Sequence, residues 1–149
     1  MTEPRYDRPG WFTTNVFNRF VRFLTRRGLS VYGSRELRVR GRKSGEWRTT
    51  PVNLLDFNGE RYLVAPRGTT QWVRNLRAIG TGELRVGRRT EAFRGEELPD
   101  ADKTPIIREY LRRWAWEVGA FFENLDANSA DETILTAAPG FPVFRVVRT

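Results

Sequence analysis

The segment from Gly41 to Pro51 holds the densest group of residues that could do chemistry, with the sequence GRKSGEWRTTP. Glycine lets backbone N–H groups approach an anion closely, and serine and threonine hydroxyls add further donors. A guanidinium presents a planar fork to phosphate or carboxylate, whereas an ammonium acts as a point charge. Both kinds of cation are present, as Arg42, Lys43 and Arg48. The segment fits a clamp for phosphate or polycarboxylate, and it equally fits a charged, solvated turn.

A second segment, Ala65 to Trp72 (APRGTTQW), is predicted to be a loop that leaves a strand and enters a helix. Thr69 or Thr70 can cap that helix, and the free N–H groups at a helix start bind anions. Arg67 adds positive charge to the loop. Because both segments adjoin the same pair of predicted strands, we expect them to converge.

Aromatic side chains form a third group, comprising Tyr110, Trp114, Trp116, Phe121 and Phe122. Trp114 fits the apolar stripe of a helix, whereas Trp116, two positions later, points elsewhere. Core packing is the expected role of most of these rings. One or two of them could instead wall a flat ligand, and Tyr110 alone among them has a hydroxyl that could donate a proton.

The sequence lacks two reactive residue types altogether, since it contains neither cysteine nor histidine. Disulfides, thiolate nucleophiles, imidazole-based triads and the commonest metal sites are thereby excluded, and no metal is expected. An enzyme built from this chain would take its reactive group from a cofactor. The formal charge of +8 over 149 residues suits an anionic ligand. A nucleic-acid partner is disfavoured, because no helix-turn-helix, RRM or zinc-finger pattern accompanies the charge.

The elements that must position these residues begin with a loose arm at residues 1–10. Trp11 to Leu24 has apolar residues at spacings of three and four, which predicts an amphipathic helix over residues 11–27. It would pack on its own domain or lie on a membrane surface. No cleavable signal peptide is visible, and no apolar run approaches the roughly 20 residues that span a bilayer. We therefore expect a cytoplasmic domain, with peripheral membrane contact left open.

Strands dominate the middle of the chain. The expected strands are Leu37–Arg40, Pro51–Phe57, Glu60–Ala65, Glu83–Gly87, Thr90–Arg94 and Phe141–Val147. Asn58-Gly59 is the preferred pair for a type I′ hairpin turn, and a second hairpin is expected to turn at Arg88-Arg89. About six antiparallel strands with interspersed helices predict one α+β, barrel-like domain over residues 1–149.

Two helices are expected among these strands. The first spans Gln71 to Ile79, with Trp72, Leu76 and Ile79 on one helical face. The second opens at Thr104-Pro105, and its apolar stripe runs to Leu125. Strict strand–helix alternation and dinucleotide-binding glycine patterns are absent, which disfavours a Rossmann sheet.

Three motifs taken in order resemble one family. Gly41-Arg42-Lys43-Ser44-Gly45, then Arg48-Thr49-Thr50-Pro51, then Trp72-Val73-Arg74-Asn75-Leu76 are similar to G-R-x-[ST]-G-x-x-R-x-x-P and W-x-x-N-L of the deazaflavin-dependent nitroreductases of actinobacteria. The resemblance extends from Ser34 to Val86. It implies an antiparallel split β-barrel of the FMN-binding type with peripheral helices. It also implies coenzyme F420, whose tail carries a phosphodiester and several glutamates; FMN or FAD is the alternative cofactor.

The resemblance also implies roles for particular residues. Those that would hold the phosphate, tail and ring edge are Arg42, Lys43, Ser44, Arg48, Thr49, Thr50, Pro51, Val52 and Asn53. Those that would line the ring are Val64, Ala65, Pro66 and Arg67. Those that would close the site are Gln71, Trp72, Val73, Arg74 and Asn75.

The implied reaction is hydride transfer from the reduced cofactor to a quinone, enone, imine or nitro compound. Arg67 or Tyr110 would stabilise the developing anion, and Trp114 and Trp116 would line the substrate pocket. Pro66 stands where the family usually has serine, so a hydrogen bond to substrate or cofactor is lost there. The alternative is a split barrel that binds another flavin or anionic ligand without catalysis. Exposed strand edges suggest a homodimer.

Overall fold

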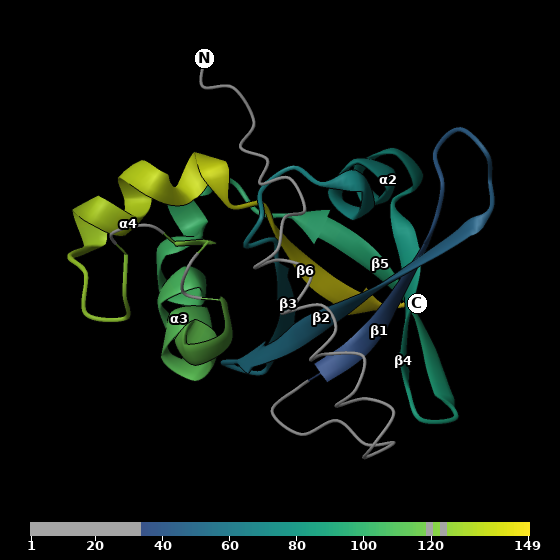
Figure 1. The fold of residues 1–149 in the computed structure, drawn as a ribbon, viewed down its shortest axis with the longest axis horizontal. Coiled ribbons are helices and arrows are strands. Elements are labelled where there is room, and N and C mark those ends of the chain that lie inside the picture. Colours follow the sequence, from purple (N-terminus) through teal and green to yellow (C-terminus); the bar gives the residue numbers. More distant parts are fainter. Residues whose placement is uncertain (1–33, 119–120, 123–124) are drawn as a thin grey trace.

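The computed structural model describes residues 34–118, 121–122 and 125–149 (Figure 1). The expected arm at residues 1–10 and the expected helix at 11–27 lie outside the described residues.

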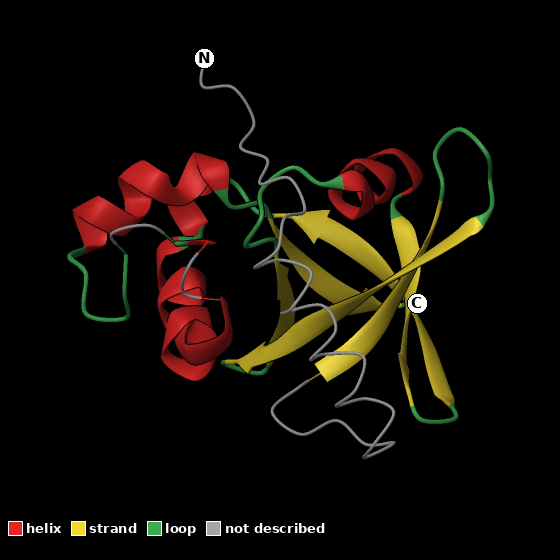
Figure 2. Ribbon diagram, viewed as in Figure 1, coloured by secondary structure: helices red, strands yellow, loops and turns green. Residues whose placement is uncertain are grey.

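Six strands close into one antiparallel barrel in the order β1-β2-β3-β6-β5-β4 (Figure 2). Their bounds are β1 Ser34–Arg40, β2 Trp47–Phe57, β3 Glu60–Val64, β4 Thr81–Val86, β5 Arg89–Glu97 and β6 Val143–Arg148. The predicted fold class is confirmed. The strand edges on which the homodimer expectation rested are used within the chain, because β1 also pairs with β4.

Three α-helices lie around the barrel in the described part of the chain: α2 Gln71–Ile79, α3 Thr104–Val118 and α4 Asp131–Ala137. Two 3-10 turns, η1 Asp100–Asp102 and η3 Ala138–Gly140, join helices to strands. Figure 1 shows α2 over one end of the barrel, near the β1–β2 loop, with α3 and α4 stacked against one side.

Each of the two hairpin turns contains a glycine with a positive φ angle. Asn58 and Gly59 have φ angles of 49° and 80°, so both central residues have the positive φ of the expected type I′ turn. In the second hairpin Val86 pairs with Arg89, so the turn is Gly87-Arg88 and the expected Arg88-Arg89 is wrong by one residue. Gly87 has a φ of 58°, a conformation that glycine adopts at no steric cost.

The barrel interior is one of two apolar cores. Its members come from all six strands and α2: Leu37, Val39, Val52, Leu54, Leu63, Ala65, Val73, Leu76, Leu84, Phe93, Phe144 and Val146. Leu76 closes the α2 end against Gly95, where a Cβ would lie 3.0 Å from Leu76 Cδ2. Ile79, expected on the same helical face as Leu76, is 40% exposed. The helix ends at Ile79, since Gly80 is left-handed.

The second core lies outside the barrel, between α3 and strands β2, β3 and β6. Ile107, Tyr110 and Trp114 of α3 cluster with Leu55 and Val64 of the strands. The helix ends at Val118 rather than running to Leu125.

Candidate functional site

The loop from Gly41 to Glu46 joins β1 to β2 and is closed by its own backbone. The N–H of Gly41 donates to the carbonyl of Glu46 at 2.7 Å, and the N–H of Gly45 donates to the carbonyl of Gly41 at 2.8 Å. Gly45 has a φ of 72°, where side-chain-bearing residues are strained. Ser44 Oγ accepts the N–H of Glu46 at 3.1 Å. Lys43 and Ser44 are thus held exposed at the tip of an ordered loop.

Asn75 joins the two predicted segments. Its side chain is buried, and its Oδ1 accepts both the backbone N–H of Arg42 at 3.1 Å and the Arg42 guanidinium at 2.8 Å. Gln71 Oε1 accepts from the same guanidinium at 2.9 Å. The expected convergence of the two segments is therefore confirmed. The contact is made by neutral amides, which leave the positive charge of Arg42 uncompensated.

Other cations beside the loop are also uncompensated. Arg40 donates to the carbonyl of Gly45 at 2.9 Å and lies 4.4 Å from the centre of the Trp47 ring. Lys43, Arg48 and Arg74 make no ion pair with any residue in the described ranges. This end of the barrel consequently presents a positive field to solvent, as a multivalent anion requires.

Two buried polar side chains near these segments are unsatisfied. Both polar atoms of the Asn53 amide and the Oγ1 of Thr70 are buried without a hydrogen-bond partner in the part of the chain that the structure describes. Thr70 is the N-cap of α2, yet its hydroxyl makes no capping bond. Buried polar groups are normally hydrogen-bonded, and these three atoms keep their hydrogen-bonding capacity unused.

Strand geometry divides the expected residues of β2 between two faces. Val52 faces the barrel core, whereas Asn53 is on the outer face with Leu55. Arg48 and Thr49 are exposed, and Thr50 and Pro51 are half-buried. The expected ring-lining residues divide likewise, because Val64 faces α3 and Ala65 faces the core. Core-facing residues can reach a surface ligand only through their backbone.

The β3–α2 loop is tight. The N–H of Gly68 donates to the carbonyl of Ala65 at 3.1 Å, and the N–H of Thr70 donates to the carbonyl of Gly68 at 2.9 Å. Pro66 and Arg67 are half-buried within it. At the start of α2, Val73 is in the barrel core. Trp72 packs 5.9 Å from Phe144, between ring centres.

Tyr110 and Trp114 lie in the outer core, in the same cluster as Val64. Their exposed fractions are 2% and 1%, and their ring centres are 5.0 Å apart. Trp114 Nε1 is buried without a partner among the described residues. The side chain of Trp116 lies outside what the structure describes. The structure therefore groups Tyr110 and Trp114 with one expected ring-lining residue and away from the loop at Gly41–Glu46.

Sequence reasoning missed two features of the site. The unsatisfied Thr70 hydroxyl belongs to a residue considered only as a helix cap. Asn75 was expected to close the site, but its observed contacts hold the loop. The W-x-x-N-L motif marked Asn75, although no local pattern could identify Arg42 as its partner.

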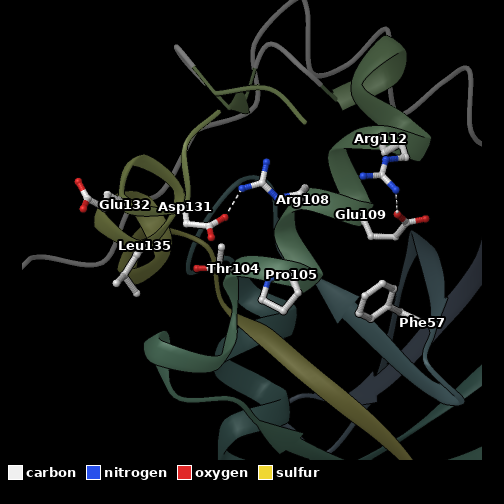
Figure 3. Close-up of a pocket in the computed structure, with 9 residues that line it drawn as sticks. All are labelled: Phe57, Thr104, Pro105, Arg108, Glu109, Arg112, Asp131, Glu132 and Leu135. Carbon is white, nitrogen blue, oxygen red and sulfur yellow. Dashed lines mark hydrogen bonds and ion pairs between the residues drawn. The ribbon is translucent and has the colours of Figure 1, made fainter. Parts of the chain in front are cut away.

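A surface hollow of about 470 Å³ lies apart from both loops, between α3, α4 and Phe57 (Figure 3). Its charged groups other than Glu132 are ion-paired. Arg108 binds Asp131, and Glu109 accepts from Arg112 and Arg113 at 3.0 Å each. None of the expected site residues lines the hollow, and we assign no ligand to it.

Within the described ranges, no helix is long and apolar enough to cross a membrane. The same ranges contain no group of three or more acidic side chains placed to hold a metal ion.

Comparison with solved structures places this architecture among known split barrels. An F420-H2-dependent reductase matches with a TM-score of 0.51 and 20% identity, covering 76% of this chain and 93% of that one. A structure described as a domain-swapped dimer matches at 0.55 and 17%, covering 89% and 98%. A haem storage protein from Vibrio cholerae matches at 0.54 and 9%, covering 89% and 90%. These identities show the fold alone.

A family model matches residues 21–120 and is described as F420H2-dependent quinone reductase. No curated protein has a sequence that matches the chain significantly. The matched residues include both loops, α2 and β1 to β5. The expected relationship to the deazaflavin-dependent reductases is confirmed. The chain belongs to the F420H2-dependent quinone reductase family and is an oxidoreductase that uses coenzyme F420.

Proposed function

We propose that this protein transfers a hydride from reduced coenzyme F420 to an electron-poor acceptor, with a quinone as the favoured class. The observation that carries the proposal is the Arg42–Asn75 contact, in which a neutral amide orients a guanidinium without neutralising it. When bound, the cofactor supplies the hydride. Residues of the chain supply binding, orientation and stabilisation of charge.

The loop at Gly41–Glu46 fits the charged tail of the cofactor. Arg42, Lys43 and Arg48 would hold its phosphodiester and glutamate groups through charge-assisted hydrogen bonds. Arg42 is already fixed by Asn75 and Gln71, so little side-chain entropy is lost when it binds an anion. Lys43 and Arg48 are exposed and act mainly through their charge.

The polar edge of the ring would meet the unsatisfied atoms. The Asn53 amide can donate and accept at once, which matches an edge that carries both carbonyl and N–H groups. The Thr70 hydroxyl and the free N–H groups at the start of α2 add donors. Val64 and Pro66 would offer apolar contact.

Arg67 is the better placed of the two residues expected to stabilise the acceptor anion. It is half-buried in the β3–α2 loop, whereas Tyr110 is 2% exposed among aromatic rings. A guanidinium donates to a developing oxyanion without giving up its own proton. Pro66 has neither a hydroxyl nor an N–H to share this role. The proposal therefore favours quinones over nitro compounds.

The test is a titration with F420, FMN and FAD in parallel, following quenching of tryptophan fluorescence. We expect tight binding of F420 alone and a loss of about tenfold or more in Arg42→Ala, since a hydrogen bond to a charged group contributes about 1.5–3 kcal/mol. Arg77→Ala is the matched control, because Arg77 lies on α2 but is paired with Glu97. Equal losses in both variants, or a preference for FMN or FAD, would contradict the proposal.

Turnover is then followed as oxidation of reduced F420 by a naphthoquinone and by a nitroaromatic compound. We expect the quinone to be reduced faster. Arg67→Gln should lower kcat while leaving the Kd for F420 nearly unchanged. A protein that binds F420 but oxidises it with neither acceptor would favour the non-catalytic alternative.

A homodimer is a further proposal, supported by the structure described as a domain-swapped dimer. The barrel leaves no unpaired strand edge among the described strands, so such a dimer would exchange elements rather than add strand to strand. Light scattering of the purified chain measures the mass directly.

A further inference from the structure

The mouth of the barrel opposite α2 is lined by charge. Side chains alternate along each strand, so residues spaced by two from the core residues share the inward face. At this end the charged residues at inward positions beyond the apolar core are Arg35, Asp56, Arg61, Arg89, Glu91 and Arg148, and β4 adds the apolar Val86. We call the charged set the far mouth. Strands β1, β2, β3, β5 and β6 each contribute to it.

Contacts across the barrel confirm that these side chains converge. Arg61 of β3 binds Glu91 of β5, although β6 lies between the two strands. Arg148 of β6 donates to the same carboxylate at 3.2 Å. Arg35, from the other side of the barrel, interacts electrostatically with Asp56, Arg61, Glu91 and Arg89.

The cations of the far mouth outnumber its acids. Four arginines face two carboxylates, an excess of two positive charges among these side chains. Glu91 is occupied by Arg61 and Arg148. Arg35 donates to the carbonyl of Ser34 at 3.0 Å, and neither it nor Arg89 forms an ion pair within the described ranges.

Part of this excess is desolvated, because Arg35 and Arg61 are half-buried, whereas Arg89 and Arg148 are exposed. Burial is the main cause that lowers the pKa of Arg35. The positive charges of Arg61 and Arg89 lower this pKa further, whereas the negative charges of Asp56 and Glu91 raise it. Arg61 has only 19% of its side chain exposed. Like charges in such surroundings repel more strongly than in water, and an anion among them relieves the repulsion.

We propose that the far mouth binds a phosphate-sized, multivalent oxyanion. Guanidinium groups bind phosphate and carboxylate oxygens bidentately, and here Arg35 and Arg89 are available for that contact. The far mouth lies apart from the proposed F420 site, because Arg35 faces into the barrel near the start of β1, whereas the Gly41–Glu46 loop follows the other end of β1 and Asn53 faces outward. The α2 helix and the β4–β5 turn mark these two ends in Figure 1. The inference does not depend on the proposed function.

The test is calorimetric titration of the full chain with pyrophosphate and with citrate, at an ionic strength held constant with sodium chloride. We expect binding that weakens about tenfold in Arg35→Gln and in Arg89→Gln, since each removes a charged donor that the proposal assigns to the anion. Arg145→Gln is the matched control among the arginines of the barrel strands, because Arg145 faces outward and pairs with Glu96. Lys43→Gln is the control at the opposite end. Neither control should weaken binding, and saturating F420 should not compete.

Binding of pyrophosphate alone would identify phosphate groups as the ligand chemistry, and equal binding of citrate would extend it to polycarboxylates. Loss of binding in Lys43→Gln, or competition by F420, would overturn the proposal by placing the anion on the cofactor loop. Equal weakening in all four variants would reduce the effect to net charge. Absence of binding would leave the far mouth as an ion-paired closure of the barrel.

Discussion

The β1–β2 loop and strand β5 use arginine in opposite ways. Beside the loop, Arg40 and Arg42 donate to a backbone carbonyl and to side-chain amides. Along β5, three glutamates each bind a guanidinium from another element: Glu91 with Arg61, Glu96 with Arg145 and Glu97 with Arg77. A neutral acceptor fixes the geometry of an arginine and leaves its charge, whereas a carboxylate removes both its freedom and its field. The loop therefore leaves the charge of its arginines open to a ligand, whereas the glutamates of β5 neutralise the arginines that they bind.

The strongest test of this contrast gives Arg42 a carboxylate partner, as the arginines beside β5 have. Asn75→Asp keeps an acceptor for Arg42 but turns the contact into an ion pair. We expect the fold to persist while the affinity for F420 falls about tenfold and depends less steeply on salt. Fluorescence titration at two ionic strengths measures both.

Asn58→Asp is its matched control, because it adds the same charge at the β2–β3 turn, where aspartate is tolerated. The control should bind F420 as the unaltered protein does. If both variants lost affinity equally, the neutral contact at Arg42 would have no special part.

A smaller effect is expected from Gly41→Ala. An added Cβ would lie 2.7 Å from Ser44 Oγ. The serine must then rotate and release the N–H of Glu46, at a cost of about 0.5–1.5 kcal/mol. Urea unfolding measures the loss.

Ser44→Ala is the second single variant of a double-mutant cycle with Gly41→Ala. Gly41→Ala should cost little more in a background that already carries Ser44→Ala, because the clashing oxygen is gone. Fully additive losses would show that the cost of Gly41→Ala arises elsewhere.

The smallest expected effect concerns β5. The hydrogen bond from Arg61 holds the pKa of Glu91 below its ordinary value, with burial opposing the shift. The resulting stability is present above the ordinary pKa of about 4.3 and is lost as pH falls through the lowered value in the fold. Solvent screening limits it to about 0.5 kcal/mol.

Glu91→Gln should therefore be less stable than the unaltered protein at neutral pH, with a difference that shrinks in acid. Glu132→Gln is the control, since Glu132 is exposed and makes no ion pair with a described residue. Unfolding midpoints at several pH values measure both. A difference for Glu91→Gln that stayed constant with pH would contradict the assignment.

The features of the fold that the sequence predicted correctly are those encoded by residues close together along the chain. The turn at Asn58-Gly59 and the start of α3 at Thr104-Pro105 were predicted correctly, because both are encoded by adjacent residues. The end of α3 was wrong, since an apolar stripe continues in the sequence after the helix stops. Helix α4 was not predicted at all, because its seven residues offer too short a periodicity.

The site showed the same division. The two loops could be identified from composition and motif order. The Arg42–Asn75 contact and the far mouth could not, because each depends on residues that meet only when the barrel closes. Arg35 and Glu91 are separated by most of the barrel strands in the sequence and lack any local pattern that would pair them.

The position of β6 has a consequence for how the chain is made. It is the last strand in sequence, yet it lies between β3 and β5, and Tyr62 of β3 pairs with Arg145 of β6. Until β6 leaves the ribosome, β3 and β5 each present an unpaired edge, the feature by which nascent chains aggregate. Closure must also wait for contacts that are distant along the chain, which slows folding. The six-residue strand β6 thus closes the barrel, and the five strands synthesised before it need protection from aggregation until it pairs.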